Sequence, residues 1–284
     1  MKVLNSEKNA QFMRSKVYKH MLKTRGWKYR VFLRYLRFFK YISFSKTRGD
    51  FLEFYYTLMR YIDDIVDGDA PIPKAYANSV EFLLEKIHFS KNPVNPRDEV
   101  DFLMLHCFNL AKKMNHDFQH ETNDILNALL FDAKRRGKLI IFPEKELMYH
   151  FHLLDIRGTI KATLKIFNEA PEKYNLLEPL GIATRFQFDL EDFEADIKAG
   201  YVNITKEECL LFGIENKDLH QINSPAIKKW FKYRAKKGLD LLKEHRNLLP
   251  KGKFSMLTRV TFPIVYEYPA RKLFKEVLSK QSSL

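Results

Sequence analysis

The chain has 284 residues and a formal net charge of +14, set by 49 Lys and Arg against 35 Asp and Glu. Hydrophobic residues make up 45 % and charged residues 30 %, which is typical of a globular protein with a substantial core and excludes a disordered or collagen-like chain. Charges interrupt every apolar run before it reaches the roughly 18 residues of a membrane-spanning helix, and the amino terminus shows no signal-peptide pattern.

The amino-terminal segment, residues 1–40, is predicted to be helical, basic and rich in aromatic residues. Residues 11–40 contain ten Lys or Arg and no Asp or Glu. The aromatic residues among them are Phe12, Tyr18, Trp27, Tyr29, Phe32, Tyr35, Phe38 and Phe39. Such a segment folds back onto the protein, lies on an anionic membrane surface, or binds nucleic acid. No nucleic-acid-binding signature accompanies it, so we expect no nucleic-acid partner and keep a membrane surface as a candidate partner.

Helical periodicity continues through the rest of the chain, and strand-like alternation is scarce. The predicted helices cover about 10–25, 28–44, 48–67, 75–90, 97–115, 118–137, 144–168, 176–198, 206–213, 225–246 and 253–280. Pro, Gly and Asn clusters separate them, for example at residues 92–96 and 170–171. We therefore predict an all-α protein, with one domain at residues 41–284 behind the amino-terminal segment.

Cysteine usage favours a reducing compartment. Cys107 and Cys209 show neither the spacing of metal ligands nor that of a disulfide framework. The nine His residues show no metal-ligand or nucleophilic-triad pattern. We therefore expect a cytoplasmic protein, with peripheral association with a membrane left open.

The predicted helix 48–67 ends in a pair of carboxylates. Asp63 and Asp67 are four residues apart, so their side chains lie on one face of the helix about one turn apart. Arg60 and Tyr56 fall on the same face. Like charges at this spacing repel one another, and burial beside apolar neighbours is costly unless the carboxylates are paired or bind a metal. The pattern therefore indicates a functional role.

The predicted helix 176–198 repeats this pattern. Asp192 and Asp196 are four residues apart, and Asp189 precedes them by one turn. If the two helices face one another, both aspartate pairs converge on one cavity. Mg²⁺ prefers oxygen ligands and usually combines one or two carboxylates with substrate phosphates, so we predict about two or three Mg²⁺ ions holding a diphosphate. Departure of the diphosphate would leave a carbocation, which a dry pocket lined by aromatic faces can stabilise.

These motifs resemble the squalene/phytoene synthase family, the trans-isoprenyl diphosphate head-to-head synthases, from roughly residue 45 onwards. The first motif of that family matches Asp63–Asp67, with Arg60 and Tyr56 before it, and the second matches Asp192–Asp196. Further matches, in chain order, are Tyr149, Gly158, Leu180-Gly181, Gly200, Glu207 to Gly213, Arg234-Ala235, Leu248 to Pro250 and Tyr266.

The resemblance implies an all-α, class I isoprenoid synthase-like helical bundle with a central cavity, formed by a catalytic domain at residues 41–284. It also implies a Mg²⁺-dependent prenyltransferase that condenses two prenyl diphosphates, farnesyl or geranylgeranyl, head-to-head. The product is then of the squalene or phytoene type, and the intermediate of the presqualene type. Use of NADPH is left open, because the chain shows no nicotinamide fingerprint and the family members that use NADPH lack one as well.

The resemblance also assigns roles to residues. Those expected to bind Mg²⁺ and to act in catalysis are Asp63, Asp67, Asp192 and Asp196. Tyr56 and Tyr149 are expected to be catalytic as well, through hydrogen bonds to the diphosphate or by steering the cation. Those expected to bind substrate are Arg60, Asp64, Arg185, Phe188, Asp189 and Tyr266.

Departures from the family pattern surround the second motif. Arg185 and Phe188 stand where Gln and Asn are usual, Glu191 replaces an Arg, and Asn203 replaces a Tyr. Because the missing Asn is commonly a metal ligand, one Mg²⁺ site is expected to be weaker or to use Asp189. Two other functions therefore stay open. One is transfer of a single prenyl group to a second small molecule, for example an aromatic acceptor. The other is a non-catalytic relative that serves in binding or assembly.

Overall fold

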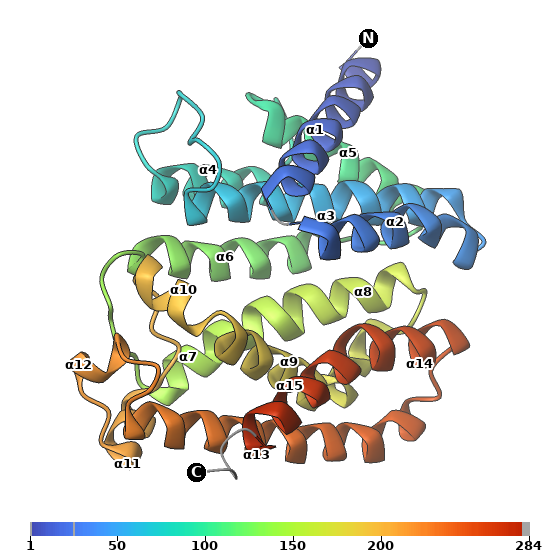
Figure 1. Ribbon diagram of the computed structural model, residues 1–284. Coiled ribbons are helices and arrows are strands. Elements are labelled where there is room, and N and C mark those ends of the chain that lie inside the picture. The colour runs from blue at the N-terminus through green and yellow to red at the C-terminus, as the bar shows by residue number, and fades with distance from the viewer. Residues whose placement is uncertain (1, 25, 280–284) are drawn as a thin grey trace. The chain divides into compact units, whose positions relative to one another are not determined.

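The computed structural model describes the backbone of residues 2–24 and 26–279 and the side chains of residues 7–23 and 30–279. All regular elements in these ranges are helices (Figure 1), which confirms the predicted all-α class. Trp27 and Tyr29 of the predicted aromatic segment lie outside the described side chains.

The described helices gather into two compact units. The first contains Met1–Ala133 and Lys165–Asn168, and the second contains Lys134–Leu164 and Glu169–Leu284. Residues 1–40 are part of the first unit, and the domain boundary predicted at residue 41 stays a prediction.

The first unit is built around one largely buried helix, α3. Its helices are α1 (Lys2–Thr24), α2 (Gly26–Ile42), α3 (Lys46–Asp67), α4 (Ser79–Lys91), α5 (Glu99–Lys113) and α6 (Gln119–Arg135). α3 contacts α1, α2 and α5, and its side chains Phe51, Leu58, Ile62 and Ile65 are fully buried. With buried Phe54, these apolar residues recur every three or four positions, so a broad face of α3 fills the core.

α3 begins and ends at defined capping residues. The Ser45 hydroxyl accepts a hydrogen bond from the backbone N–H of Arg48 at 3.3 Å, which satisfies one of the free donors at the helix start. Gly68 has a φ of 76° and ends the helix directly after Asp67, because glycine adopts this left-handed conformation without strain. The first acidic motif is therefore fixed on the last turns of α3.

The amino-terminal helices bury one face and expose the other. Met13 and Val17 of α1 and Leu36 of α2 are buried, whereas Phe12 and Phe38 are exposed. Both helices contact α3. None of the described helices combines the length and the hydropathy needed to cross a membrane. Attachment of this segment to a membrane surface stays a prediction.

The second unit is organised by its longest helix, α13. Its elements are α7 (Glu144–Phe151), η1 (His152–Ile160), η2 (Pro171–Leu176), α9 (Glu178–Glu191), α10 (Phe193–Ala199), α11 (Lys206–Phe212), α12 (Asn216–Leu219), α13 (Pro225–Leu248), η3 (Leu249–Gly252), α14 (Met256–Phe262), η4 (Pro263–Glu267) and α15 (Tyr268–Ser279). The chain passes between the units through α8 (Lys161–Ile166). α13 packs against α9 and α15, and Ile227, Trp230, Leu242 and Phe274 are fully buried there.

Three of the predicted long helices are interrupted in the structure. The predicted helix 144–168 contains the π-helical segment η1, and the predicted helix 253–280 contains another, η4. The predicted helix 176–198 breaks at Asp192, which has φ −103° and ψ 10° and caps both α9 and α10. A single wide turn or a single cap residue leaves the apolar periodicity of the sequence almost unchanged, so the periodicity did not predict these interruptions. The three carboxylates expected on one continuous helix face are therefore divided between two helices.

Candidate active site

Arg60 binds the two carboxylates that follow it on α3. Its Nη1 lies 2.8 Å from Asp63 Oδ2, and its Nε donates to Asp64 Oδ1 at 2.7 Å. Burial alone would lower the pKa of Arg60, but the charges of Asp63 and Asp64 outweigh burial and raise this pKa above its ordinary value. Asp64 is fully buried, whereas the Asp63 side chain is 32 % exposed. Asp64 therefore holds Arg60 in place, and Asp63 is the carboxylate that reaches the surface.

Asp67 and Tyr56 lie on the turns after and before this cluster. Asp67 is half-buried and is the last residue of α3, where its charge adds to the negative end of the helix dipole. A carboxylate in that position costs stability unless a cation lies nearby. Tyr56 is half-buried and packs edge-on against Phe32, with ring centroids 5.0 Å apart. Tyr56, Arg60, Asp63 and Asp67 thus occupy successive turns of one helix.

The second motif spans the junction of α9 and α10. Asp192 is exposed at the break, and its backbone oxygen accepts from the Asp196 N–H at 2.8 Å, so one helical turn still separates the two carboxylates. Burial raises the pKa of Asp196 to about 7, with Asp189 and Asp192 adding to the effect and Arg185 and Arg135 opposing it. Burial therefore disfavours the negatively charged form of the Asp196 carboxylate.

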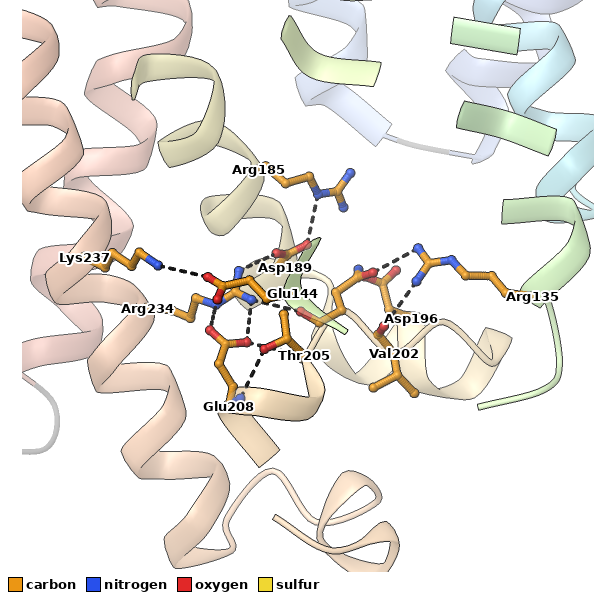
Figure 2. A network of polar contacts seen from close by, with 11 residues as sticks. Arg135, Glu144, Arg185, Asp189, Asp196, Val202, Thr205, Glu208, Arg234 and Lys237 are labelled. Atoms are coloured by element: carbon orange, nitrogen blue, oxygen red, sulfur yellow. Dashed lines mark hydrogen bonds and ion pairs between the residues drawn. The ribbon is translucent and has the colours of Figure 1, made fainter. Parts of the chain in front are cut away.

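A buried polar network supports this motif (Figure 2). Arg234 on α13 donates from Nε and Nη2 to Oε1 and Oε2 of Glu208 at 2.6 and 2.7 Å, and from Nη1 to Asp189 Oδ2 at 3.1 Å. Its guanidinium also lies over the Phe186 ring, 4.2 Å from the centroid. Glu208 in turn forms a capping box with Thr205 at the start of α11. One buried cation therefore ties α9, α11 and α13 together.

Asn203 connects the network to Asp196. Its Nδ2 donates to Asp196 Oδ2 at 2.9 Å, its Oδ1 accepts from Arg135 Nη2 at 2.9 Å, and its backbone oxygen accepts from Arg234 Nη2 at 3.2 Å. Arg135 also donates to the backbone oxygen of Val202 at 3.2 Å. A side-chain amide that is fixed at both ends has one orientation, so Asn203 sets the orientation of the Asp196 carboxylate.

Sequence reasoning predicted no supporting role for these residues, although Arg234 lies in a segment that resembles the family. Arg135 gave no signal, and Asn203 stood out only as a departure from the family pattern. Arg234 did give a signal, because it shares the apolar face of α13 with Ile227 and Trp230, all of which are buried. A charged residue on the apolar, buried face of a helix is expected to form a buried ion pair.

Asp189 is fully buried, and arginines take both of its carboxylate oxygens. Oδ1 accepts from Arg185 Nε at 2.9 Å and Oδ2 from Arg234. Arg185 lies over the Phe151 ring, 5.1 Å from the centroid, and its terminal amino groups point away from Asp189 (Figure 2). In this arrangement Asp189 anchors Arg185 and is not an open oxygen ligand.

Two glycines close the end of the second motif. Gly200 ends α10 with a φ of 89°, and a Cβ at this position would lie 2.3 Å from the backbone nitrogen of Gly137. The Gly137 N–H donates to Ala199 O at 2.9 Å, and the Leu139 N–H donates to Gly200 O at 3.2 Å. Direct backbone contact therefore holds residues 137–139 against the helix that carries Asp196.

Tyr149 lines a cavity at the surface of the second unit. The side chain is exposed on α7, and the cavity measures about 790 Å³. Met148 and His152 on the α7 side and Ile182 on α9 form part of the wall. A mostly apolar cavity of this size is large enough for a small organic ligand.

Phe188 and Tyr266 are the remaining predicted residues. Phe188 is exposed on α9, and its backbone oxygen accepts from the Asp192 N–H at 2.9 Å, so it lies one turn before the second motif. Tyr266 is half-buried on η4 against Phe262, with ring centroids 5.5 Å apart. The structure thus places the predicted residues of the second unit on α7, α9, α10 and η4.

The donor sets of both motifs fit Mg²⁺. Asp63 and Asp67 belong to the first unit, and Asp192 and Asp196 to the second. Each pair offers hard oxygen donors one helical turn apart, which suits an ion that completes its shell with phosphate and water. Asp67 adds its charge to a negative helix end, and burial disfavours the charged form of Asp196, so a bound divalent cation would stabilise both carboxylates. Among the described residues, no three His, Cys, Asp or Glu side chains gather into a metal-binding group.

Two solved structures are similar to this chain over nearly its whole length. Squalene synthase HpnC from Alicyclobacillus acidocaldarius aligns with 98 % of this chain and 95 % of its own, with a TM-score of 0.69 and 12 % identity. A dehydrosqualene synthase in complex with a ligand aligns over 100 % of both chains, with a TM-score of 0.60 and 17 % identity. No protein-family profile and no curated protein sequence matches the chain. The predicted squalene/phytoene synthase-like fold is therefore confirmed, and identities at this level show the fold alone.

Proposed function

We propose that this protein is a Mg²⁺-dependent prenyltransferase that condenses two prenyl diphosphates head-to-head. The fold supports a prenyltransferase-like enzyme, because a squalene synthase and a dehydrosqualene synthase are among the solved structures similar to it. One observation carries the finer proposal: each unit carries an aspartate pair, one member of which an arginine with little exposed surface orients, directly or through Asn203. Arg60 does so for Asp63, and the Arg234 network does so for Asp196.

In the proposed reaction, the aspartate pairs bind Mg²⁺ and the prenyl diphosphate. Bound Mg²⁺ would supply Lewis-acid neutralisation of the diphosphate as it departs with the electron pair of the C–O bond. Arg60 and Arg185 supply fixed positive charge beside the two motifs, because Asp64 and Asp189 hold their guanidinium groups. Asn203 orients Asp196. Tyr56 and Tyr149 are the tyrosines proposed to contact diphosphate or cation.

Product analysis tests the reaction. The purified full-length protein is incubated with labelled farnesyl or geranylgeranyl diphosphate and Mg²⁺, with or without NADPH, and the organic phase is analysed by mass spectrometry. A symmetric C30 or C40 hydrocarbon is expected, and its saturation reports whether NADPH is used. Chelation of Mg²⁺ by EDTA should abolish its formation.

Conservative variants link the product to the two motifs. Asp63→Asn and Asp192→Asn keep side-chain size but remove the charge, and each should lower kcat by at least about 100-fold. Glu194→Gln is the matched control, because Glu194 is an exposed carboxylate two residues from Asp192 and should leave kcat unchanged. Wild-type activity in both aspartate variants would exclude catalysis by these motifs and favour a non-catalytic binding role.

The exposed Phe188 and the cavity beside Tyr149 favour a second candidate function. The apolar cavity of about 790 Å³ could hold an apolar or aromatic acceptor in place of a second prenyl diphosphate, and Phe188 separately places an apolar side chain one turn before Asp192. The product assay separates the two functions. Diphosphate release without a C30 or C40 hydrocarbon, and turnover to a prenylated product only when an acceptor is added, would favour acceptor prenylation.

A further inference from the structure

The carboxy-terminal helices of the second unit present an exposed apolar stripe. Met256 and Val260 of α14, Ile264 of η4 and Tyr268 of α15 are 77, 43, 64 and 67 % exposed. The four residues are spaced at intervals of four along one continuous helical run. Single exposed apolar side chains are ordinary, but a line of four large ones on one face marks an interaction surface.

The π-helical turn narrows this stripe. In an α-helix of 3.6 residues per turn, residues four apart drift by about 40° around the axis, so three steps would spread the stripe over about 120°. η4 spans Pro263–Glu267, and the wider i→i+5 turn of a π-helix reduces this drift. Tyr268 therefore lies closer to the line of Met256, Val260 and Ile264 than it would on an uninterrupted α-helix. Wide turns of this kind are frequent at functional sites.

The charge of the surrounding surface is positive. Residues 246–276 contain seven Lys or Arg and two Glu. Both acids are already paired: Glu267 with Arg246 and Arg271, and Glu276 with Lys272 at 4.0 Å. The exposed basic side chains along this run are Arg246, Lys251, Lys253, Arg259, Lys272 and Lys275. Along residues 246–276 positive charge therefore predominates, and both acids are already engaged by basic side chains.

A small pocket adjoins the stripe and contains two arginines. The pocket has a volume of about 300 Å³, and its wall includes Arg246, Arg271, Ile264 and Tyr268. The buried carboxylate of Glu267 positions both arginines, accepting from Arg246 Nε at 2.6 Å and Arg271 Nη2 at 2.8 Å. The Arg246 side chain is 61 % exposed, and its terminal amino groups have no partner among the described residues. The Arg246 guanidinium group is thus fixed at Nε, and its terminal amino groups can bind an anion beside the exposed side chains of Ile264 and Tyr268.

We propose that this face of α14, η4 and α15 docks on an anionic membrane surface, with a lipid phosphate at Arg246 and Arg271 and the stripe in the interfacial region. An apolar stripe flanked by Lys and Arg is the pattern of helices that lie in the plane of a membrane. Each basic residue near an anionic leaflet adds to the attraction, and Tyr suits the boundary between apolar and wet regions. The proposal does not depend on the reaction above, because none of these residues belongs to the aspartate motifs.

Vesicle binding of the full-length protein tests this proposal. The wild-type protein should co-sediment with vesicles of phosphatidylcholine and phosphatidylglycerol, and not with vesicles of phosphatidylcholine alone. Ile264→Ser combined with Tyr268→Ser should weaken binding at least about tenfold, because two exposed apolar side chains are removed. The matched control is Leu210→Ser with Leu211→Ser, two exposed apolar residues on α11 of the same unit, which should bind like wild type.

Three further results would overturn the proposal. The first is equal binding to neutral and anionic vesicles, or no binding to either. The second is loss of binding in Phe38→Ser with Tyr41→Ser, exposed residues of α2, while the Ile264 and Tyr268 variant still binds. The third is release of the protein by inorganic phosphate at constant ionic strength, together with no effect of the Ile264 and Tyr268 substitutions on binding. That result would indicate a site for a soluble anion.

The proposal also predicts that Lys272→Gln with Lys275→Gln weakens binding to anionic vesicles and makes this binding less dependent on salt concentration.

Discussion

At the scale of single residues, buried arginines organise the charges of both acidic motifs. Arg60 sits between Asp63 and Asp64, and Arg234 sits between Asp189 and Glu208. The desolvation of such groups is costly, and the ion pairs offset that cost only while both partners are present. The main effect of these arginines is therefore to fix the positions of the carboxylates of the two motifs, Asp63 and Asp196.

Arg234→Met should destabilise the protein strongly. The substitution introduces an unbranched apolar side chain and leaves the buried carboxylates of Asp189 and Glu208 without the cation that they share. Loss of about 3–5 kcal/mol in the free energy of unfolding is expected, measured by urea denaturation. Lys237→Met is the control: Lys237 lies on the same helix, pairs with exposed Glu144 at 3.8 Å, and should cost less than about 1 kcal/mol. Equal losses in the two variants would contradict the structural role given to Arg234.

At the scale of elements, one buried lysine joins α4 to the start of α5. Lys86 is fully buried and binds Asp98 and, at 2.6 Å, Asp101 Oδ1. Asp98 is the N-cap of α5, accepting from the Val100 and Asp101 N–H groups, and also accepts from the Tyr76 hydroxyl at 2.6 Å. The carboxylate of Asp98 thus both caps the start of α5 and binds Lys86 of α4.

This cluster predicts an acid-dependent loss of stability. Burial would raise the pKa of Asp98, but the hydrogen bonds from Lys86 and Tyr76 outweigh it and hold the pKa below its ordinary value. The stabilisation is therefore complete above the unfolded pKa of about 3.9 and is lost as the pH falls through the folded pKa. The pKa of Lys86 is raised overall, because the bonds to Asp101, Asp98 and Tyr76 outweigh burial. The stabilisation contributed by charged Lys86 is therefore lost only as the pH rises through the pKa of Lys86 in the alkaline range.

Asp98→Asn measures this effect, because Asn still caps a helix but carries no charge. The wild type should exceed the variant in free energy of unfolding by a constant amount near neutral pH, and the difference should shrink below about pH 4. In a Lys86→Met background most of this pH dependence should disappear. A difference that stays constant down to about pH 2 would show that the charge of Asp98 contributes nothing.

At the scale of the whole molecule, each of the two compact units carries one aspartate pair. A ligand bound at either pair stabilises the folded chain by an amount set by its concentration relative to its Kd, about 2.7 kcal/mol at 100 times the Kd. A non-reactive prenyl diphosphate analogue together with Mg²⁺ should therefore raise the Tm. Asp63→Asn and Asp192→Asn should each reduce the shift, although they lie in different units. Glu194→Gln should keep it, and an unchanged shift in either aspartate variant would remove that pair from the binding site.

Much of the fold could be predicted from the sequence. Apolar positions spaced by three and four along α3 and α13 predict helices and their buried faces, and Gly68 marks the end of α3 because a left-handed residue favours glycine. The two aspartate pairs were equally visible, because charge at four-residue spacing on an otherwise apolar helix is conspicuous. These are local properties, set by the helical period and by single-residue conformation.

The support of the second motif was decided only by the tertiary structure. Arg135, Asn203 in the loop after α10, and Arg234 on α13 are far apart in the chain, and hydrogen bonds join them into one network with Asp196 and Asp189. The breaks at Asp192 and at the π turns η1 and η4 were likewise invisible, because they change one turn without changing the apolar pattern. The sequence by itself determined the helices and the carboxylates, since those depend on neighbouring residues. Tertiary contacts decided which cation faces which carboxylate, because burial and partner choice depend on residues far apart in the chain.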